Sequence, residues 1–291
     1  MMYPLKLNKR GKRMRNVKIV ADSSADLLAL EGVAFATAPL KIIAGDREFV
    51  DDAALDVEEM VAWFDSYKGK SKTSCPNPGD WIEAFDGAEE VFCVAITSGL
   101  SGSYNAACVA KQMYEAENPG KRVYVIDSLS AGPELVLIIE KLKEWIGEDK
   151  PFGDICEEIE YYKKSTGLVF MLESLKNFAA NGRVSPAVAK IAGVLGIRIV
   201  GKASDQGTLE PTDKCRGAAK ALEALLKNMC AAGLNSGKVR IAHCQNEAAA
   251  EKMAQMLREA VPQAQISIHT LRGLCSYYAE KGGLLIGFEK K

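Results

Sequence analysis

The sequence predicts an α/β protein of two domains: a parallel-sheet αβα domain, then a mixed-sheet α/β domain. Three observations lead to this prediction. The chain has 291 residues, about twice the length of a common domain. Up to about residue 165, short apolar runs alternate with amphipathic helical segments, which is typical of a parallel sheet with crossover helices. Beyond that point, Asp205-Gln-Gly207 lies between two expected strands, 197–200 and 208–211, and indicates a hairpin with antiparallel pairing.

The first domain is predicted to span residues 17–165. Its expected strands are 17–21, 33–38, 48–50, 91–96 and 123–126, and the run at 91–96 is the most apolar. Asp56 is expected to cap a helix, since apolar residues follow it at helical spacing. Residues 72–80, rich in Pro and Gly, predict a loop that opens a helix capped by Asn77. Further helices are expected over 104–117, through 135–142, and from 151 to about 164.

The second domain is predicted to span residues 166–291. Its expected strands are 168–172, 197–200, 208–211, 239–243, 266–269 and 284–288. Long helices are predicted at 214–229 and 247–260. Residues 1–16 carry six Lys and Arg and no acid, and we expect them to form a disordered basic tail.

Composition excludes several classes of protein. Hydrophobic residues make up 48% and charged residues 26%, which is ordinary for a globular protein and argues against disorder, collagen and coiled coil. A net charge of −1 argues against nucleic acid as a partner, because such proteins usually carry a basic stripe. No apolar run reaches the roughly 18 residues of a spanning helix, so we expect no stable membrane insertion.

The eight cysteines show neither a C-x-x-C motif nor the paired spacing of a zinc site. Most lie inside apolar runs, as Cys93 does, where a free thiol behaves as a small hydrophobic side chain. We therefore expect reduced, structural cysteines in a cytoplasmic protein.

The loops that follow the predicted strands are rich in hydroxyl side chains and glycine. The hydroxyl-bearing positions include Ser23, Ser24, Thr73, Ser74, residues 97–103, Ser128 and Ser130. Backbone N–H groups at helix starts, together with hydroxyls, suit an anion, and parallel sheets bind ligands at the carboxyl ends of their strands. Any single Ser or Thr there is more simply a helix cap. Together the loops predict an anion or carboxylate pocket.

Catalytic motifs are not evident. Gly99-Leu-Ser-Gly-Ser103 is not the G-x-S-x-G of an esterase, and no phosphate loop or dinucleotide fingerprint occurs. The only two histidines, His243 and His269, each end an apolar run and are better explained by strand-end packing than by a Ser–His dyad. The pairs Asp22/Asp26 and Asp51/Asp52 could hold Mg²⁺, but we interpret them as solvated acids and turn caps. We expect no metal.

Six motifs in order resemble the DegV family. They are Asp22-Ser-Ser-Ala-Asp-Leu27, Thr73-Ser-Cys-Pro-Asn-Pro-Gly79, Ser98-Gly-Leu-Ser-Gly-Ser-Tyr104, Asp127-Ser128, Asn181-Gly-Arg-Val-Ser185 and Lys214-Cys-Arg-Gly217. The resemblance covers residues 17–288. It implies a bacterial, non-enzymatic lipid-binding protein that holds a long-chain fatty acid in a tunnel between its domains and has no other cofactor. It also implies a partner, an ATP-dependent fatty acid kinase that receives the carboxylate. The alternative is a small-molecule phosphotransferase or hydrolase that uses the same Ser/Gly loops.

The resemblance also assigns residues. Thr73 and Ser101 should hold the carboxylate from the starts of two helical segments at one sheet edge, with Ser74 and the backbone at Gly102 beside them. Arg183 is similar to the family's arginine near the head group, and Arg216 to one that faces the kinase. Two positions depart from the family pattern: Cys75 replaces an amide, and Tyr278 stands where the family has a histidine.

Overall fold

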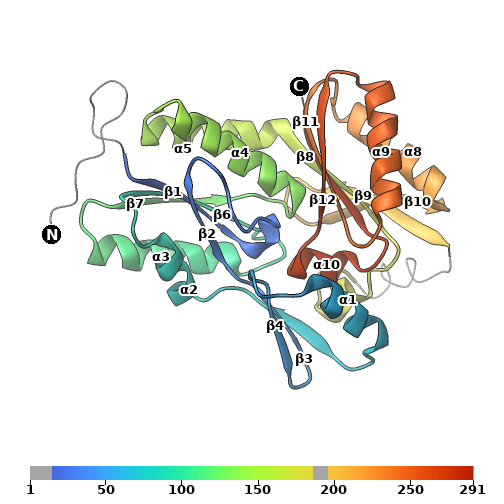
Figure 1. Ribbon diagram of the computed structural model, residues 1–291, viewed down its shortest axis with the longest axis horizontal. Coiled ribbons are helices and arrows are strands. Elements are labelled where there is room, and N and C mark those ends of the chain that lie inside the picture. Colours follow the sequence, from blue (N-terminus) through green and yellow to red (C-terminus); the bar gives the residue numbers. More distant parts are fainter. Residues whose placement is uncertain (1–14, 186–195, 291) are drawn as a thin grey trace.

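The computed structural model describes residues 15–185 and 196–290, which form three β-sheets (Figure 1). The first sheet contains β1 (Val17–Asp22), β2 (Ala34–Ala38), β6 (Glu90–Ala95) and β7 (Arg122–Asp127). Its strand order is β2-β1-β6-β7, and all neighbouring strands are parallel, which confirms the predicted parallel sheet. The strand order changes direction between β1 and β6, the kind of position where α/β sheets bind ligands.

Helices cover both faces of this sheet, as the αβα prediction requires. One face packs against α2 (Pro78–Phe85) and α3 (Ser103–Glu117), and the other against α4 (Pro133–Gly147) and α5 (Phe152–Tyr162). Asn77 caps α2 as predicted, since its side chain accepts the N–H groups of Gly79 and Asp80. Helix α4 also packs against the second sheet, so it joins the two halves of the molecule (Figure 1).

The second sheet has six strands and confirms the predicted mixed sheet. In spatial order it contains β10 (Leu209–Arg216), β9 (Ile197–Ala203), β8 (Thr166–Leu172), β13 (Leu284–Glu289), β11 (Gly237–His243) and β12 (Ala264–Thr270). Strands β11 and β12 are parallel, and the other neighbouring pairs are antiparallel, including the predicted hairpin of β9 and β10. Helices α8 (Ala218–Ala231) and α9 (Glu247–Ala260) cover one face, while the opposite face turns toward the first half of the chain.

A third, antiparallel sheet was not predicted. It consists of β3 (Lys41–Ala44), β4 (Arg47–Val50) and β5 (Ser71–Ser74), with α1 (Val57–Ser66) between β4 and β5 in sequence. Asp56 caps α1 as predicted. The expectation of a loop over residues 72–80 was wrong for residues 72–74, which lie in β5, and was confirmed for residues 75–77, which lead into α2. Strand β5 reads Ser-Lys-Thr-Ser and has little strand propensity, but its backbone pairs with β3 over four residues, so tertiary pairing overrides composition.

Two further differences concern helices. The helix expected from residue 214 begins at Ala218, because Lys214, Cys215 and Arg216 pair with β9 and Gly217 ends the strand at a φ of 87°. The short helices α6 (Lys176–Ala180) and α10 (Gly273–Ala279) and the 3₁₀ turn η1 (Ser23–Ala25) were not predicted as helical, whereas the 3₁₀ turn η2 (Lys163–Ser165) lies at the end of the helix predicted to about residue 164. Helices this short carry too few periodic positions to be recognised from hydrophobic spacing.

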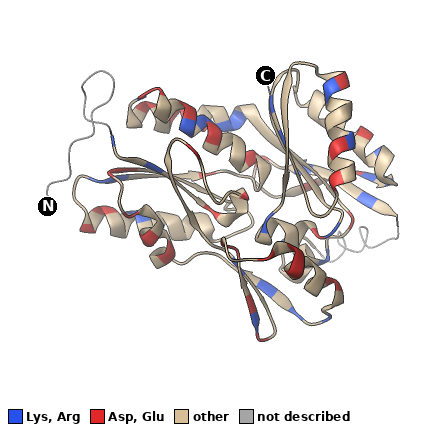
Figure 2. Ribbon diagram, viewed as in Figure 1, with Lys and Arg blue, Asp and Glu red and all other residues tan. Residues whose placement is uncertain are grey.

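Charges are mixed over the described surface. Acidic and basic side chains both occur along α4 and α9 (Figure 2). Within residues 15–185 and 196–290, no helix is long and apolar enough to cross a bilayer. Almost all of the tail predicted at residues 1–16 lies outside the described residues.

Candidate functional site

A cavity of about 310 Å³ lies between the two large sheets. This volume is at the lower end of the range of about 300–1,000 Å³ found for small-molecule sites. The loops after β6 and β7, strand β5, helix α10 and the β9–β10 hairpin all contribute to it. The lining residues are Leu40, Thr73, Ser74, Cys75, Ile96, Thr97, Leu100, Ser101, Gly102, Ser130, Ala131, Leu168, Phe170, Leu172, Phe178, Arg183, Ala203, Gly207, Thr208, Leu209, Leu274, Cys275, Tyr278, Ala279 and Leu285.

Most of the cavity wall is apolar. Leu168, Phe170 and Leu172 of β8 all line it because alternate residues of a strand point to the same face. Leu285 adds to this face from β13, the strand next to β8. The inner face of the mixed sheet therefore supplies a surface that favours a hydrocarbon chain.

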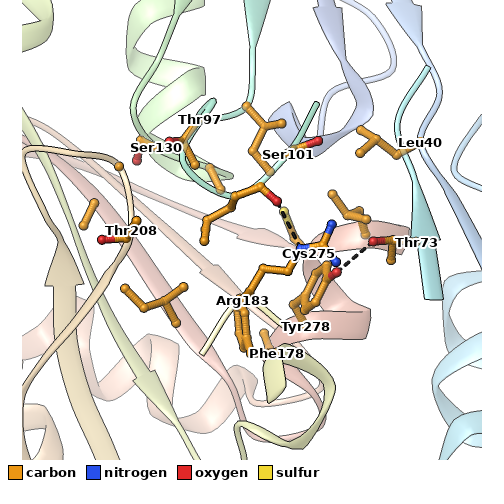
Figure 3. A pocket seen from close by; sticks show the side chains of 18 of the residues that line it. Leu40, Thr73, Thr97, Ser101, Ser130, Phe178, Arg183, Thr208, Cys275 and Tyr278 are labelled. Carbon is orange, nitrogen blue, oxygen red and sulfur yellow. Dashed lines mark hydrogen bonds between the residues drawn. The ribbon is translucent and has the colours of Figure 1, made fainter. Parts of the chain in front are cut away.

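The polar part of the cavity contains a pair of hydroxyl groups. Oγ1 of Thr73 and the phenol oxygen of Tyr278 form a hydrogen bond of 2.8 Å (Figure 3). Burial raises the pKa of Tyr278, while the hydrogen bond to Thr73 and the Arg183 charge oppose the increase. The phenol therefore keeps its proton at neutral pH. The position at which the family histidine is replaced thus still presents a hydrogen-bonding group to the cavity.

Arg183 supplies the positive charge, and it is the only charged side chain among the described lining residues. Its Nε donates to the carbonyl oxygen of Leu100 at 3.1 Å (Figure 3), and its Nη1 donates to the carbonyl oxygen of Asn181 at 2.6 Å. These bonds fix the guanidinium beside the loop that carries Ser101. An arginine held in this way can pair with an anionic group that enters the cavity.

The Ser101 loop leads directly into α3. Oγ of Ser101 accepts the N–H of Ser103 at 3.2 Å, and Gly102 is the N-cap residue of α3. A Cβ on Gly102 would lie 3.4 Å from Sγ of Cys75, so the glycine allows the two loops to approach closely. Ser74 is largely exposed at the rim, where its Oγ donates to the carbonyl oxygen of Cys75 at 3.3 Å.

All six residues expected at the ligand line this cavity, but the expected geometry of Thr73 was wrong. Thr73 lies on strand β5 and not at the start of a helix. Thr73 lines the same cavity as Ser101 from the third sheet, because the backbone of β5 pairs with β3. Arg216 does not line the cavity. It is the last residue of β10, the edge strand of the mixed sheet.

Three aspartates organise the surrounding loops, and the interpretation of Asp22, Asp26 and Asp51 as solvated acids was wrong. Asp22 is fully buried and does cap η1. Its Oδ2 also accepts the N–H of Ile96 at 2.8 Å and the hydroxyl of Ser103 at 2.6 Å. Burial raises the pKa of Asp22, and these hydrogen bonds oppose the increase. Asp22 therefore ties the end of β1 to both ends of the Ser101 loop.

The other two aspartates hold α10, the helix that carries Tyr278. The fully buried carboxylate of Asp51 accepts the N–H groups of Gly273 and Leu274 at 2.9 Å each. Asp26 accepts the N–H of Arg272 at 2.8 Å, and burial raises its pKa to about 8. No motif in the sequence signals these contacts, because their partners are more than 200 residues away.

Neither histidine lines the cavity. His243 ends β11, where its Nδ1 accepts the N–H of Asn246 at 3.2 Å, and His269 lies near the end of β12, where Nε2 pairs with Oγ of Ser267 at 2.8 Å. Burial lowers the pKa of both. Within residues 15–185 and 196–290, no cluster of three or more His, Cys, Asp or Glu residues could hold a metal ion.

An apolar cavity with one arginine and several hydroxyl groups defines a class of protein, a two-part α/β binding protein for an amphipathic ligand with an anionic head. A sequence model of the DegV family, described as uncharacterised proteins, matches residues 16–291. The chain belongs to the DegV family. A DegV domain-containing protein of Streptococcus pneumoniae is 42% identical over 276 residues, covering 94% of this chain and 98% of that protein.

Solved structures give the same result. A DegV family protein from Eubacterium eligens, loaded with heptadecanoic acid, is 44% identical with a TM-score of 0.93, over 94% of this chain and 100% of that one. The fatty acid kinase (Fak) B3 protein of Streptococcus pneumoniae, loaded with linoleic acid, is 41% identical with a TM-score of 0.93, over 95% of this chain and 100% of that one. The fold is thus the DegV fold, as the sequence motifs implied.

Proposed function

We propose that this protein binds a long-chain fatty acid in the cavity between its two large sheets and presents the carboxylate to a separate ATP-dependent fatty acid kinase. It acts as a carrier and not as an enzyme. The observation that carries the proposal is the composition of the cavity wall: apolar strands on one side, and Thr73, Ser101, Arg183 and Tyr278 together on the other. Two relatives more than 40% identical over nearly the whole chain hold fatty acids.

The energetics suit such a ligand. Each buried methylene group contributes about 0.8 kcal/mol, so a chain of about 15 such groups could contribute up to about 12 kcal/mol. Ordering the chain and restricting its motion take back several kcal/mol. The carboxylate is then satisfied by one guanidinium and neighbouring hydroxyl groups, which a buried anion requires.

Native mass spectrometry of freshly purified protein tests the proposal. We expect a co-purified mass of about 250–290 Da, the range of fatty acids with 16 to 18 carbons, that organic extraction removes. Extracted protein should then rebind added fatty acid. Protein that emerges empty, does not bind fatty acids and hydrolyses or transfers a phosphoester by itself would establish the phosphotransferase or hydrolase alternative.

Arg216 is the residue that we propose for contact with the kinase. Its side chain is exposed at the end of an edge strand and does not line the cavity, so it suits docking rather than contact with the carboxylate. Arg216→Ala should slow acyl phosphate formation by an added fatty acid kinase subunit and leave fatty-acid affinity unchanged. Lys202→Ala, an exposed cation on the neighbouring strand β9, is the matched control.

We also propose that residues 17–165 and 166–291 are the two domains and that the protein acts in the cytoplasm. The sheets support this division into domains, since the parallel sheet lies before Thr166 and the mixed sheet begins at Thr166. All eight cysteines are free thiols, which supports a reducing compartment. Limited proteolysis and cell fractionation test the two statements.

A further inference from the structure

Asn181 lies behind the polar part of the cavity and is not one of the residues that line it. Its side-chain amide joins two of the segments that do. Oδ1 accepts the N–H of Thr73 at 3.2 Å, and Nδ2 donates to the phenol oxygen of Tyr277 at 3.0 Å. Nδ2 also donates to the carbonyl oxygen of Asn177 at 2.9 Å, so both amide hydrogens are used.

The backbone of the same residue holds the charged group of the site. The carbonyl oxygen of Asn181 accepts Nη1 of Arg183 at 2.6 Å. Asn181 therefore contacts strand β5 through Thr73, helix α10 through Tyr277, and the guanidinium of Arg183. These three elements come from distant parts of the sequence, and each supplies one head-group residue.

Tyr277 extends this network along β5. Its phenol oxygen lies 2.7 Å from Oγ of Ser71, and Ser71 and Thr73 are two residues apart on the same side of the strand. Tyr277 is also the residue next to Tyr278, whose phenol bonds Thr73. Strand β5 and helix α10 are thus linked at two points, and Asn181 makes a hydrogen bond to each side of that link.

We propose that Asn181 is a positioning residue for the head-group site, which places Thr73, Tyr278 and Arg183 so that all three meet one carboxylate. The inference rests on the proposed fatty-acid function. Productive contact with a small anion requires the partners to be held within about 0.5 Å, and an amide with all of its hydrogen bonds filled provides that constraint. Loss of the amide leaves the N–H of Thr73 and the phenol of Tyr277 with one partner fewer.

The experiment compares ligands that differ only in the head group. Delipidated protein is titrated with palmitic acid and with the alcohol of the same chain length, and thermal unfolding is recorded for each variant. For Asn181→Ala we expect about tenfold weaker binding of the acid, which corresponds to about 1.4 kcal/mol, and a change of less than about twofold for the alcohol. The acid-to-alcohol preference is the readout that a purely structural role would not change.

Asn177→Ala is the matched control, because Asn177 is the same residue type one helical turn earlier. Its side chain donates to the carbonyl oxygen of Tyr277 at 2.7 Å and has no hydrogen bond to Thr73 or Arg183. We expect it to lower the melting temperature and to keep the preference for the acid. Tyr277→Phe is a milder second variant that retains the ring and removes the hydroxyl, and it should give a smaller selective loss.

The outcomes separate the inference from the proposed function. If Asn181→Ala and Tyr277→Phe weaken acid and alcohol equally, or change neither, Asn181 does not position the head-group site. If the wild-type protein binds neither ligand, the proposed function itself fails and the inference fails with it. If the wild-type protein binds both ligands equally, the cavity does not recognise a carboxylate and no residue can be positioned for one.

Discussion

The hydrogen bond between Thr73 and Tyr278 gives the most direct test of the head-group site. Tyr278→Phe removes the phenol hydroxyl but retains the ring, which packs at 4.7 Å between centroids against Phe178. Thr73→Val removes the other partner of the 2.8 Å bond and keeps the β-branched shape. Both changes therefore alter hydrogen bonding with little change in volume, so their effects can be assigned to the polar atoms.

The magnitude follows from what each hydroxyl contributes. A hydrogen bond to a charged group contributes about 1.5–3 kcal/mol, so losing one donor to the carboxylate should weaken fatty-acid binding by about ten- to a hundredfold. The same reasoning applies to Ser101→Ala. Because Thr73 and Tyr278 bond each other, the double variant should lose less than the sum of the single losses, by about 0.5 kcal/mol or more.

Titration with a fluorescent fatty acid measures these affinities, and melting curves recorded in parallel measure folding. Tyr124→Phe is the matched control, since the Tyr124 hydroxyl bonds Glu160 at 3.1 Å and does not line the cavity. The competing explanation is that Thr73 and Ser101 serve only the local backbone. In that case their substitution would lower stability by about 1 kcal/mol and leave affinity unchanged, and unchanged affinity in both variants would refute the carboxylate assignment.

Three further predictions concern other parts of the molecule. Arg183→Ala should weaken fatty-acid binding at least about tenfold in the same titration. Arg183→Lys should recover part of this loss, because lysine keeps the positive charge but lacks the two-pronged guanidinium. An Arg183→Ala variant that binds fatty acid as tightly as the wild type would contradict this prediction. Burial raises the pKa of Asp26 from 3.8 to about 8, so the folded protein keeps a proton on this carboxyl group that the unfolded chain releases near pH 4. The stability that protonated Asp26 contributes is therefore lost as the pH rises toward 8. In urea unfolding, the stability of Asp26→Asn relative to the wild type should therefore increase between about pH 5 and 8. If the unfolding free energies of the two proteins change in parallel with pH, the pKa of Asp26 is not raised. Gly207 has a φ of 68°, and a Cβ at this position would collide with the side chain of Thr97. Gly207→Ala should therefore melt at a lower temperature and release fatty acid faster than the control Gly120→Ala, since Gly120 has a φ of 92° but open space around it. Equal release rates would show that the contact between Gly207 and Thr97 does not close the cavity.

The sequence by itself determined the two large sheets and the identity of the candidate ligand residues. The continuous apolar run in β6 and the alternation of strand and helix required a parallel sheet, because both faces of such strands are buried. The turn at Gly207 required antiparallel pairing after it. The order and spacing of short polar motifs carried the resemblance to the DegV family, and that resemblance implied Thr73, Ser101 and Arg183 as ligand residues.

Only the tertiary structure decided how these residues meet. Strand β5 has no strand signal of its own, and it exists because β3 pairs with its backbone, which moves Thr73 from a loop onto a sheet. The buried Asp51 fixes α10, and Asn181 links that helix to β5, through bonds that span more than 90 residues. Hydrophobic periodicity reports the environment of a residue's own element and nothing about a partner far along the chain, so such contacts appear only when the chain is folded.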